Sequence, residues 1–170
     1  MKEKLLAVDR WVVLTCHKIT QENALIRQSV IGINRWVTKV FYVLYGGMLV
    51  YLLFMDRVLF MPYFAGPFLA YVISRAIRLG YRRARPFESL DYTSHFPHSN
   101  DPSFPSMHAM SAFVIGFATF QVNGFLGGLV LLLAVLTATS RVLAGVHYPS
   151  DVLGGAGIGL MSGWVVFSIL

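Results

Sequence analysis

Residues 102–140, PSFPSMHAMSAFVIGFATFQVNGFLGGLVLLLAVLTATS, contain no aspartate, glutamate, lysine or arginine. This interval of 39 residues lies between Asp101 and Arg141, and a polar turn at residues 121–124 divides it into two apolar segments. A soluble domain could bury one uncharged helix of this kind, but not readily a whole chain of them. The stretch therefore predicts two consecutive helices in a membrane.

The same pattern occurs on both sides of this stretch. Residues 40–55 and 58–74 are uncharged, and 19 uncharged residues follow Asp151. At ~1.5 Å per residue the last run extends about 28 Å, which is enough to cross a bilayer. Charged residues make up 13% of the chain, against about 25% in soluble domains, and the mean hydropathy is +0.62. We therefore expect an integral membrane protein.

The predicted fold is an all-α integral membrane helical bundle with about five transmembrane helices plus an N-terminal interfacial amphipathic helix. Residues 1–20 mix apolar with charged side chains, so they are too polar to span and are typical of a helix at the lipid headgroups. The expected spans begin within residues 24–35, at 58, at 105 or 106, at 124 and at 150 or 151. They end at Met55, near Leu79, at Phe120, near Val142 and at Leu170.

The connections between these helices place the polar clusters on one face. Two crossings return the chain to its starting side at the polar loop formed by residues 82–105, and two more return it at residues 141–149. The opposite face has only the short turns at residues 56–57 and 121–124. Polar residues that are distant in sequence can therefore meet at one membrane surface. Ionisable groups beside hydrocarbon are candidates for function.

His147 and Asp151 form the last cluster. Residues four apart share a helix face, so the aspartate would lie beside the imidazole. Such a carboxylate fixes the histidine tautomer and stabilises its cation, which leaves the other ring nitrogen free to attack phosphorus. Alternatively, Asp151 only caps a helix start while His147 lies at the headgroups. The preceding Ser140 and Arg141 favour the catalytic interpretation.

His108 follows Pro105 and Ser106 at the start of an apolar segment. Proline is favoured in a first helical turn and serine as a cap, and the free amides of a helix N-terminus bind anions. A histidine at this place can protonate a departing oxygen as a general acid. A plain helix start would account for Pro105 and Ser106, but not for His108.

Three arginines complete the pattern: Arg78, Arg85 and Arg141. Guanidinium stays ionised and offers forked donors to phosphate oxygens. Three positive charges against about two negative charges on a phosphoryl group can stabilise an oxyanion-rich transition state without a metal ion. We interpret the neighbouring Arg82 and Arg83 as anchors to lipid headgroups instead.

The chain has arginine, six residues and Arg-Pro at residues 78–86, then Pro-Ser-Met-His at residues 105–108. Ser-Arg, five residues, His, three residues and Asp follow at residues 140–151. This order resembles the three-part signature of the type 2 phosphatidic acid phosphatase family, and the third part matches without gaps. Two positions depart from it: Arg78 stands where the family usually has lysine, and Met107 where it usually has glycine. We expect activity to survive both changes.

The resemblance implies a role for each residue. His147 would be the nucleophile, Asp151 would orient it, and His108 would be the general acid. The substrate phosphate would be held by Arg78, Arg85, Ser106 and Arg141. No metal or other cofactor is implied. The chain would form one membrane phosphatase domain over residues 1–170, with an interfacial segment at 1–23 and a transmembrane catalytic core at 24–170.

The implied activity is metal-independent hydrolysis of a lipid phosphate or diphosphate through a phospho-histidine intermediate. The compact size and five crossings resemble small bacterial undecaprenyl-diphosphatases, which convert undecaprenyl diphosphate to undecaprenyl phosphate. Phosphatidylglycerophosphate or phosphatidate phosphatase activity is the alternative, since the signature concerns only the reacting group. A non-catalytic membrane protein that binds lipid phosphates would keep the arginines, but it would not need both histidines and the aspartate.

Other ligands are disfavoured. His95, His98 and Asp101 match no strong metal-ligand spacing, and we expect them in a solvated loop. The formal charge of +6 suits an anionic lipid surface or substrate. The basic residues flank apolar runs instead of forming a solvated basic face, which argues against nucleic acid. The single cysteine, Cys16, excludes an internal disulfide. The oligomeric state is not predicted.

Two patterns disagree on the orientation in a bacterial cytoplasmic membrane. Basic residues gather on or near the face with the polar clusters, and only Arg57 lies at the other face, so the positive-inside rule would place the clusters in the cytoplasm. The resemblance to carrier-lipid diphosphatases implies an extracytoplasmic site. Functional arginines confound the count, so we expect the outward orientation.

Overall fold

The computed structural model describes residues 2–90, 92 and 101–170. Within these ranges every regular element is a helix. The helices are α1 (Lys2–Glu22), α2 (Ala24–Met55), α3 (Arg57–Gly80), α4 (Pro86–Ser89), α5 (Met107–Val122), α6 (Gly124–Leu143) and α7 (Pro149–Ile169). The prediction of an all-α bundle is confirmed.

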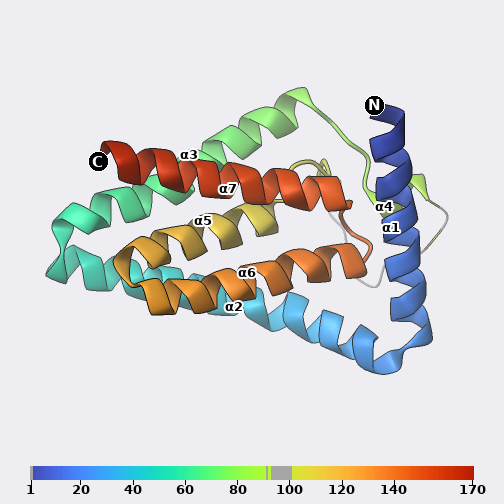
Figure 1. Cartoon of the computed structure of the whole chain (residues 1–170), viewed down its shortest axis with the longest axis horizontal. Helices are drawn as coiled ribbons and strands as arrows, with labels where there is room; N and C mark the ends of the chain where they lie inside the picture. Colours follow the sequence, from blue (N-terminus) through green and yellow to red (C-terminus); the bar gives the residue numbers. More distant parts are fainter. Residues whose placement is uncertain (1, 91, 93–100) are drawn as a thin grey trace.

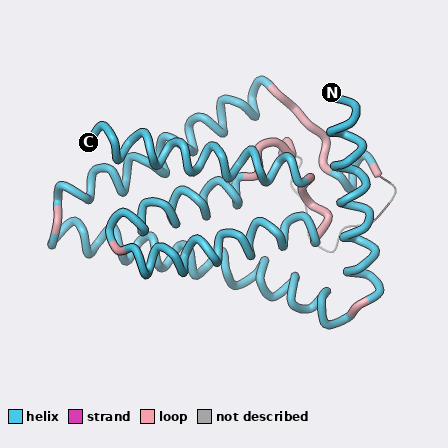
Figure 2. The backbone as a smooth tube through the Cα atoms, viewed as in Figure 1, coloured by secondary structure: helices cyan, strands magenta, loops and turns pink. Residues whose placement is uncertain are grey.

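The five long helices after α1 run side by side, and α1 lies across one end of the bundle (Figure 1). The loops drawn in Figure 2 show that α4 and the connections leading into α5 and α7 lie at this same end. We call it the polar end. The α2–α3 and α5–α6 connections lie at the opposite end, as does the C-terminus. The predicted topology, with the polar clusters on one face, is therefore correct.

In the described part of the chain, four helices are long and apolar enough to cross a membrane: α2, α3, α6 and α7. The fifth, α5, has 16 residues and is shorter. Because α3 ends at the polar end and α6 begins at the opposite end, α5 must also run the length of the bundle. Large apolar side chains on the outer faces are exposed, among them Val43, Phe54 and Phe125. The chain is an integral membrane protein.

The central position of α5 organises the bundle. It packs against α2, α3, α6 and α7, and much of its surface is buried through small residues such as Ala109, Ala112 and Ala118. Small side chains let neighbouring helices approach closely inside a membrane. The N-terminus of α5, which carries His108, is thereby held among the ends of the other helices.

Two glycines of α7 bring that helix against α5. A Cβ atom on Gly159 would lie 2.5 Å from the backbone oxygen of Met110, and one on Gly155 would lie 2.4 Å from the backbone oxygen of Ser106. Backbone atoms cannot move aside as a flexible side chain can. These positions therefore require glycine, and they set the spacing between the N-termini of α5 and α7.

Replacing Gly159 with alanine is expected to destabilise the protein by about 1–3 kcal/mol, because the added methyl group must push α7 away from α5. Gly157→Ala is the matched control on the same helix, since its Cβ would meet nothing within 4 Å. Helix propensity should make the control neutral or up to about 1 kcal/mol more stable. Thermal unfolding of both variants in detergent measures the difference, and equal melting temperatures would contradict the close packing.

Side-chain caps explain the abrupt turns. Asp56 ends α2 and accepts hydrogen bonds from the backbone N–H groups of Val58 and Leu59 at the start of α3. Asn123 separates α5 from α6 and caps α6 through the N–H of Leu126. Asn and Asp are preferred at this position because their side chains satisfy free amides.

Among its described residues, the polar loop predicted for residues 82–105 contains a short helix that was not predicted from the sequence. This helix, α4, begins with Pro86 and is a single turn. The carboxylate of Glu88 accepts a hydrogen bond from the backbone N–H of Arg85 at 2.9 Å, which satisfies a free backbone donor at the start of the helix. Proline at the first helical position and glutamate two residues later are a recognisable start signal.

The first helix is amphipathic, as predicted. Asp9, Val13 and Thr20 face the bundle and are buried, whereas Val8 and Trp11 are exposed. Thr20 Oγ1 donates to the backbone oxygen of Leu143 at 3.1 Å. One face of α1 is therefore attached to the polar end, and the other presents apolar side chains outward.

Candidate active site

His147 and Asp151 lie side by side, but they do not share a helix face as predicted. Asp151 is in the first turn of α7, whereas His147 precedes that helix. Gly145, with φ +69°, reverses the chain after α6, and Pro149 begins α7 only four residues later. His147 Nδ1 lies 3.7 Å from Asp151 Oδ2. The turn, not helical periodicity, brings the two side chains together.

The Asp151 carboxylate is fully buried and serves two purposes. Its Oδ2 accepts a hydrogen bond from the backbone N–H of Tyr148 at 2.9 Å, which caps α7. The same oxygen faces His147. The two positions considered for Asp151 from the sequence are therefore compatible. The same carboxylate caps α7 and lies beside the imidazole.

Ser103 is a member of the cluster that the sequence analysis missed. Its Oγ donates to Asp151 Oδ2 at 2.5 Å and lies 3.4 Å from His147 Nδ1. The serine is completely buried. Nothing local distinguishes it from other serines near Pro105, so no sequence signal could have identified it.

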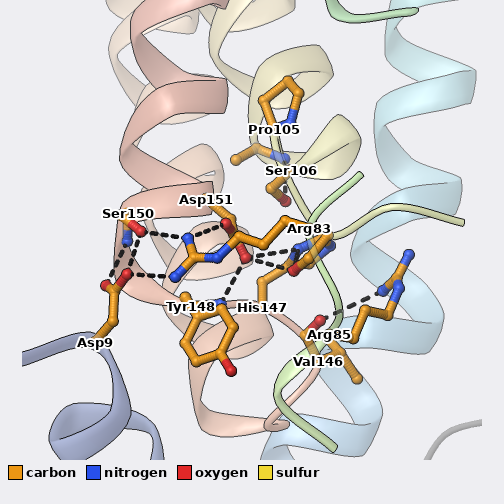
Figure 3. Close-up of polar contacts among 12 residues, drawn as sticks. Asp9, Arg83, Arg85, Pro105, Ser106, Val146, His147, Tyr148, Ser150 and Asp151 are labelled. Atoms are coloured by element: carbon orange, nitrogen blue, oxygen red, sulfur yellow. Dashed lines mark hydrogen bonds and ion pairs between the residues drawn. The ribbon is translucent and has the colours of Figure 1, made fainter. Parts of the chain in front are cut away.

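Arg83 is also part of the cluster, and its prediction as a headgroup anchor is wrong. Its side chain is only 12% exposed and forms ion pairs with Asp9 at 2.7 Å and Asp151 at 2.6 Å. Figure 3 shows the guanidinium between these two carboxylates. A cation with two carboxylate partners has little reason to reach the headgroups, whereas the adjacent Arg82 is exposed.

The start of α5 is tied directly to the start of α7. Ser106 is buried, and its backbone N–H donates to the backbone oxygen of Asp151 at 2.9 Å. Its hydroxyl accepts from the backbone N–H of Ala109 at 3.5 Å, so it caps α5 as predicted. The second and third polar clusters of the sequence are therefore in contact.

Two of the predicted phosphate-binding arginines are held by backbone carbonyl groups. Arg78 is buried, and its Nε and Nη2 donate to the oxygen of Pro105 at 3.2 and 2.8 Å. Arg85 Nε donates to the oxygen of Asp101 at 3.0 Å, and its Nη1 to that of Val146 at 3.4 Å. Each guanidinium has five N–H donors, so several remain for an anion.

His108 and Arg141 complete the arrangement. The His108 ring interacts electrostatically with four of the other groups: Arg78, Arg85, Arg141 and His147. Arg141 Nε is buried and has no hydrogen-bond partner among the described residues. A buried donor without a partner is costly. All seven predicted site residues thus gather at the polar end. We call the three arginines among them (Arg78, Arg85 and Arg141) the cationic centre; its Arg141 Nε is the donor that has no hydrogen-bond partner among the described residues.

A family model describes most of this region. The model of the PAP2 superfamily matches residues 59–170, which is more than half of the chain. The chain belongs to the PAP2 superfamily. The resemblance to type 2 phosphatidic acid phosphatases drawn from the three motifs is therefore confirmed.

Relatives of this PAP2 chain include the undecaprenyl-diphosphatase BcrC of Bacillus subtilis (strain 168), with 36% identity over 96 residues, 56% of this chain and 50% of BcrC. The decaprenylphosphoryl-5-phosphoribose phosphatase of Mycobacterium tuberculosis (strain H37Rv) is 36% identical over 108 residues, 62% of this chain and 58% of that enzyme. The PAP2 chain therefore spans only about half the length of the curated relatives that it matches.

Solved structures share the fold. The crystal structure of Aquifex aeolicus LpxE superposes with a TM-score of 0.73 and 25% identity, over 91% of this chain and 94% of that one. A transmembrane PAP2 type phosphatidylglycerolphosphate phosphatase from Bacillus subtilis gives a TM-score of 0.72 and 24% identity, over 97% of this chain and 85% of that one. The helical bundle is therefore the fold of transmembrane PAP2 proteins.

The environment of His147 in this PAP2 chain favours the neutral imidazole. Burial lowers the pKa of His147 to about 4, and the positive charges of Arg85 and Arg141 act in the same direction. Asp151 opposes this shift but does not reverse it. At neutral pH the ring therefore keeps a free lone pair, as a nucleophile requires.

We expect His147 to titrate near pH 4 in the folded protein, well below the ordinary value of 6.5. NMR of ¹⁵N-histidine-labelled protein in detergent measures this, with His147→Gln for assignment. The unfolded chain takes up a proton near pH 6.5 and the folded chain only near pH 4, so this histidine should make stability fall as the pH drops between these values. A His147 titration at 6.5 would contradict the buried environment.

A groove of about 350 Å³ opens beside His108 on the flank of the PAP2 bundle. Its walls come from α2, α3, α5 and α6, and they include Phe41, Tyr71 and Ile115. Met107, which replaces the usual glycine of the family, also lines this groove. A second cleft, of about 400 Å³, lies at the polar end beside Arg78 and Arg83. The cationic centre thus lies between the apolar groove beside His108 and the basic cleft beside Arg78 and Arg83.

Metal ligands are not grouped in the described part of the PAP2 chain. Residues 2–90, 92 and 101–170 contain no group of three or more His, Cys, Asp or Glu side chains that could hold a metal ion. Of the three residues considered in the sequence analysis, His95 and His98 lie outside the described residues. Asp101 is exposed, and its backbone oxygen accepts a hydrogen bond from Arg85.

Proposed function

We propose that this PAP2 chain is a metal-independent lipid phosphatase that acts through a phospho-histidine intermediate. The whole chain would work as one membrane phosphatase domain, with residues 1–23 as the interfacial segment and 24–170 as the transmembrane catalytic core. The observation that carries the proposal is the gathering of three arginines and two histidines at one end of an apolar bundle. Family membership supports the same reaction class.

Binding of the phosphoryl group would fall to residues that the protein already holds in place. Arg78 and Arg85 are fixed by backbone carbonyls, so their remaining donors are preorganised. Arg141 contributes the buried Nε that has no hydrogen-bond partner among the described residues. Ser106, at the start of α5, adds a hydroxyl beside free helix amides. Preorganised donors stabilise the charge that develops in the transition state.

The chemical step divides into two displacements at phosphorus. The free ring nitrogen of neutral His147 attacks, and the bond to the leaving oxygen breaks as His108 delivers a proton to it. Asp151 stabilises the imidazolium that forms. In the second displacement His108 takes a proton from water, the resulting hydroxide attacks phosphorus, and the bond to His147 breaks. The products are inorganic phosphate and the dephosphorylated lipid.

Undecaprenyl diphosphate is the substrate that we propose, with undecaprenyl phosphate as the product. The apolar groove reaches His108 from the flank of the bundle, so an isoprenoid tail could remain among the helices while its diphosphate enters the polar end. Relatives named undecaprenyl-diphosphatase support this choice. Phosphatidylglycerophosphate and phosphatidate are the alternatives, because the cationic centre contacts only the reacting group.

A panel of lipids tests the proposal. Purified protein in detergent with EDTA is given undecaprenyl diphosphate, phosphatidylglycerophosphate and phosphatidate, and phosphate release is measured for each. We expect the highest kcat/KM with undecaprenyl diphosphate. A higher value for either glycerolipid would reassign the substrate, and activity that appears only with a divalent metal would reject the metal-free mechanism. No release from any lipid would favour a non-catalytic lipid-phosphate-binding protein.

We further propose that the protein resides in a bacterial cytoplasmic membrane with its polar end outside. Bacterial relatives support the membrane assignment. Ala84→Cys places an exposed thiol at the polar end, and Gln121→Cys places one at the opposite end. In a background without Cys16, an impermeant thiol reagent applied to intact cells should label only Ala84→Cys. Labelling of Gln121→Cys alone would show that the polar end faces the cytoplasm.

A further inference from the structure

The N-terminal helix supplies a buried carboxylate to the catalytic centre. Asp9 lies on α1, and only 2% of it is exposed. Its Oδ1 accepts a hydrogen bond from the backbone N–H of Ser150 at 3.0 Å, and its Oδ2 accepts one from the Ser150 hydroxyl. Figure 3 shows these contacts at the start of α7. A helix that was expected only to lie at the headgroups is thus joined to the element that carries Asp151.

Arg83 is the link between the two carboxylates. Its Nη2 donates to Asp9 Oδ2 at 2.7 Å, and its Nη1 donates to Asp151 Oδ1 at 2.6 Å. Nη1 also donates to Ser150 Oγ at 2.7 Å, and the guanidinium lies 4.0 Å from the centroid of the Tyr148 ring. Burial opposes the positive charge, yet the two carboxylates outweigh it and raise the pKa of Arg83. The side chain is therefore a permanent cation between two anions.

The contacts of Asp151 show what this cation can do. One oxygen, Oδ1, is taken by Arg83, and the other, Oδ2, faces His147 and accepts from Ser103 and from the backbone of Tyr148. If the partner of Oδ1 were removed, the carboxylate would be held through Oδ2 alone, and it could pivot about that oxygen and change its angle to the imidazole. Arg83 therefore helps to fix the orientation of the carboxylate by holding Oδ1, the oxygen that does not face His147.

We propose that Asp9 and Arg83 are positioning residues for the catalytic pair: Asp9 holds Arg83, and Arg83 holds the carboxylate of Asp151 in line with His147. This inference rests on the proposed function. Among the described residues, the hydrogen-bond partners of the Arg83 guanidinium are Asp9, Ser150 and Asp151. The pair should therefore act on the chemical step and leave binding of the lipid nearly unchanged.

Kinetics of four variants test the proposal. Arg83→Gln should lower kcat roughly 10- to 100-fold with KM within about twofold, which is the usual scale for a supporting shell. Arg83→Lys keeps the charge but offers one ammonium group in place of the two forked donors, so it should recover only part of the loss. Asp9→Asn should lower kcat less than Arg83→Gln does. Arg82→Gln is the matched control because the side chain is the exposed neighbour in sequence, and its kcat should stay within about twofold of wild type.

A double variant tests whether Asp9 acts through Arg83. If it does, Asp9→Asn combined with Arg83→Gln should lose no more activity than Arg83→Gln alone, because effects within one chain of contacts are not additive. If the loss of kcat in the double variant equals the product of the losses in the two single variants, Asp9 does not act through Arg83. A wild-type kcat in Arg83→Gln, or a loss that appears only in KM, would overturn the proposal. Gel filtration and thermal unfolding confirm that each variant is folded.

A measurement without turnover separates this inference from the proposed function. In the ¹⁵N-histidine titration, Arg83→Gln should raise the pKa of His147, because the Asp151 charge is no longer shared with a cation. The other charged groups that act on His147 stay in place in this variant: Asp151, Arg85 and Arg141. An unchanged His147 titration would overturn the inference even if wild type released no phosphate. Inactive wild-type protein with a shifted titration would reject the proposed function alone.

Discussion

His147→Ala is expected to abolish phosphate release, with kcat reduced by roughly 10,000-fold or more, because the variant lacks the ring nitrogen that we propose as the nucleophile. Other groups cannot take over this role. Asp151 is engaged by Arg83, Ser103 and the backbone of Tyr148. What remains in the variant is a set of cations that can bind a lipid phosphate without forming a bond to it.

Trapping of the intermediate provides the decisive measurement. Wild-type protein mixed with undecaprenyl diphosphate that carries ³²P in its terminal phosphate, and then quenched in alkali, should retain label that acid removes, as a phospho-histidine does. His147→Ala should retain none, whereas His108→Ala should accumulate label because its intermediate is hydrolysed slowly. Normal phosphate release by folded His147→Ala would reject the nucleophile assignment. Label on His108 instead would exchange the roles of the two histidines.

His108→Ala is expected to lower the rate of the first displacement by an amount that depends on the leaving group. For phosphatidate the leaving oxygen becomes an alkoxide, which needs a proton, so the loss should be roughly 100- to 10,000-fold. For undecaprenyl diphosphate the leaving group is a phosphate monoester, which is a stable anion, and the loss should be much smaller. The exposed His108 ring beside the lipid groove is placed to protonate either one.

Single-turnover experiments isolate this first step, since in the proposed mechanism His108 also takes part in the later hydrolysis of the intermediate for every substrate. The two lipids are compared in wild type and His108→Ala, and the ratio of the two losses is the readout. Equal losses for both would contradict the general-acid assignment and would indicate that the ring acts only in hydrolysis. Ser111→Ala, in the same groove one turn further along α5, is the matched control, and the ratio of its rates with the two lipids should stay close to that of wild type.

The helices could be predicted because partition between lipid and water is largely a local property of the sequence. Uncharged runs mark α2, α3, α6 and α7, and the predicted ends differ from the observed ones by only a few residues. Local chemistry also marks the turns, where Asp56 and Asn123 cap the helices that follow them. Because each spanning helix carries the chain from one end of the bundle to the other, the order of the helices predicted that all three polar clusters lie at the same end.

The supporting residues could not be predicted in this way. Arg82 and Arg83 are neighbours with the same side chain, but Arg82 is exposed whereas the Arg83 side chain is only 12% exposed. The difference comes from Asp9, a partner of Arg83 that lies 74 residues away in the sequence. Ser103 gains its role from Asp151, 48 residues away. Neither partner is visible in the local pattern around these positions.

The amino-acid sequence by itself determined the order of the spans, the family signature and the side of the bundle on which the polar groups gather, since each depends on local hydrophobicity or on residue identity. Only the tertiary structure decided which charges pair. Ion pairs form over a few ångströms, and those distances follow from how α1 crosses the polar end and how Gly155 and Gly159 let α7 approach α5.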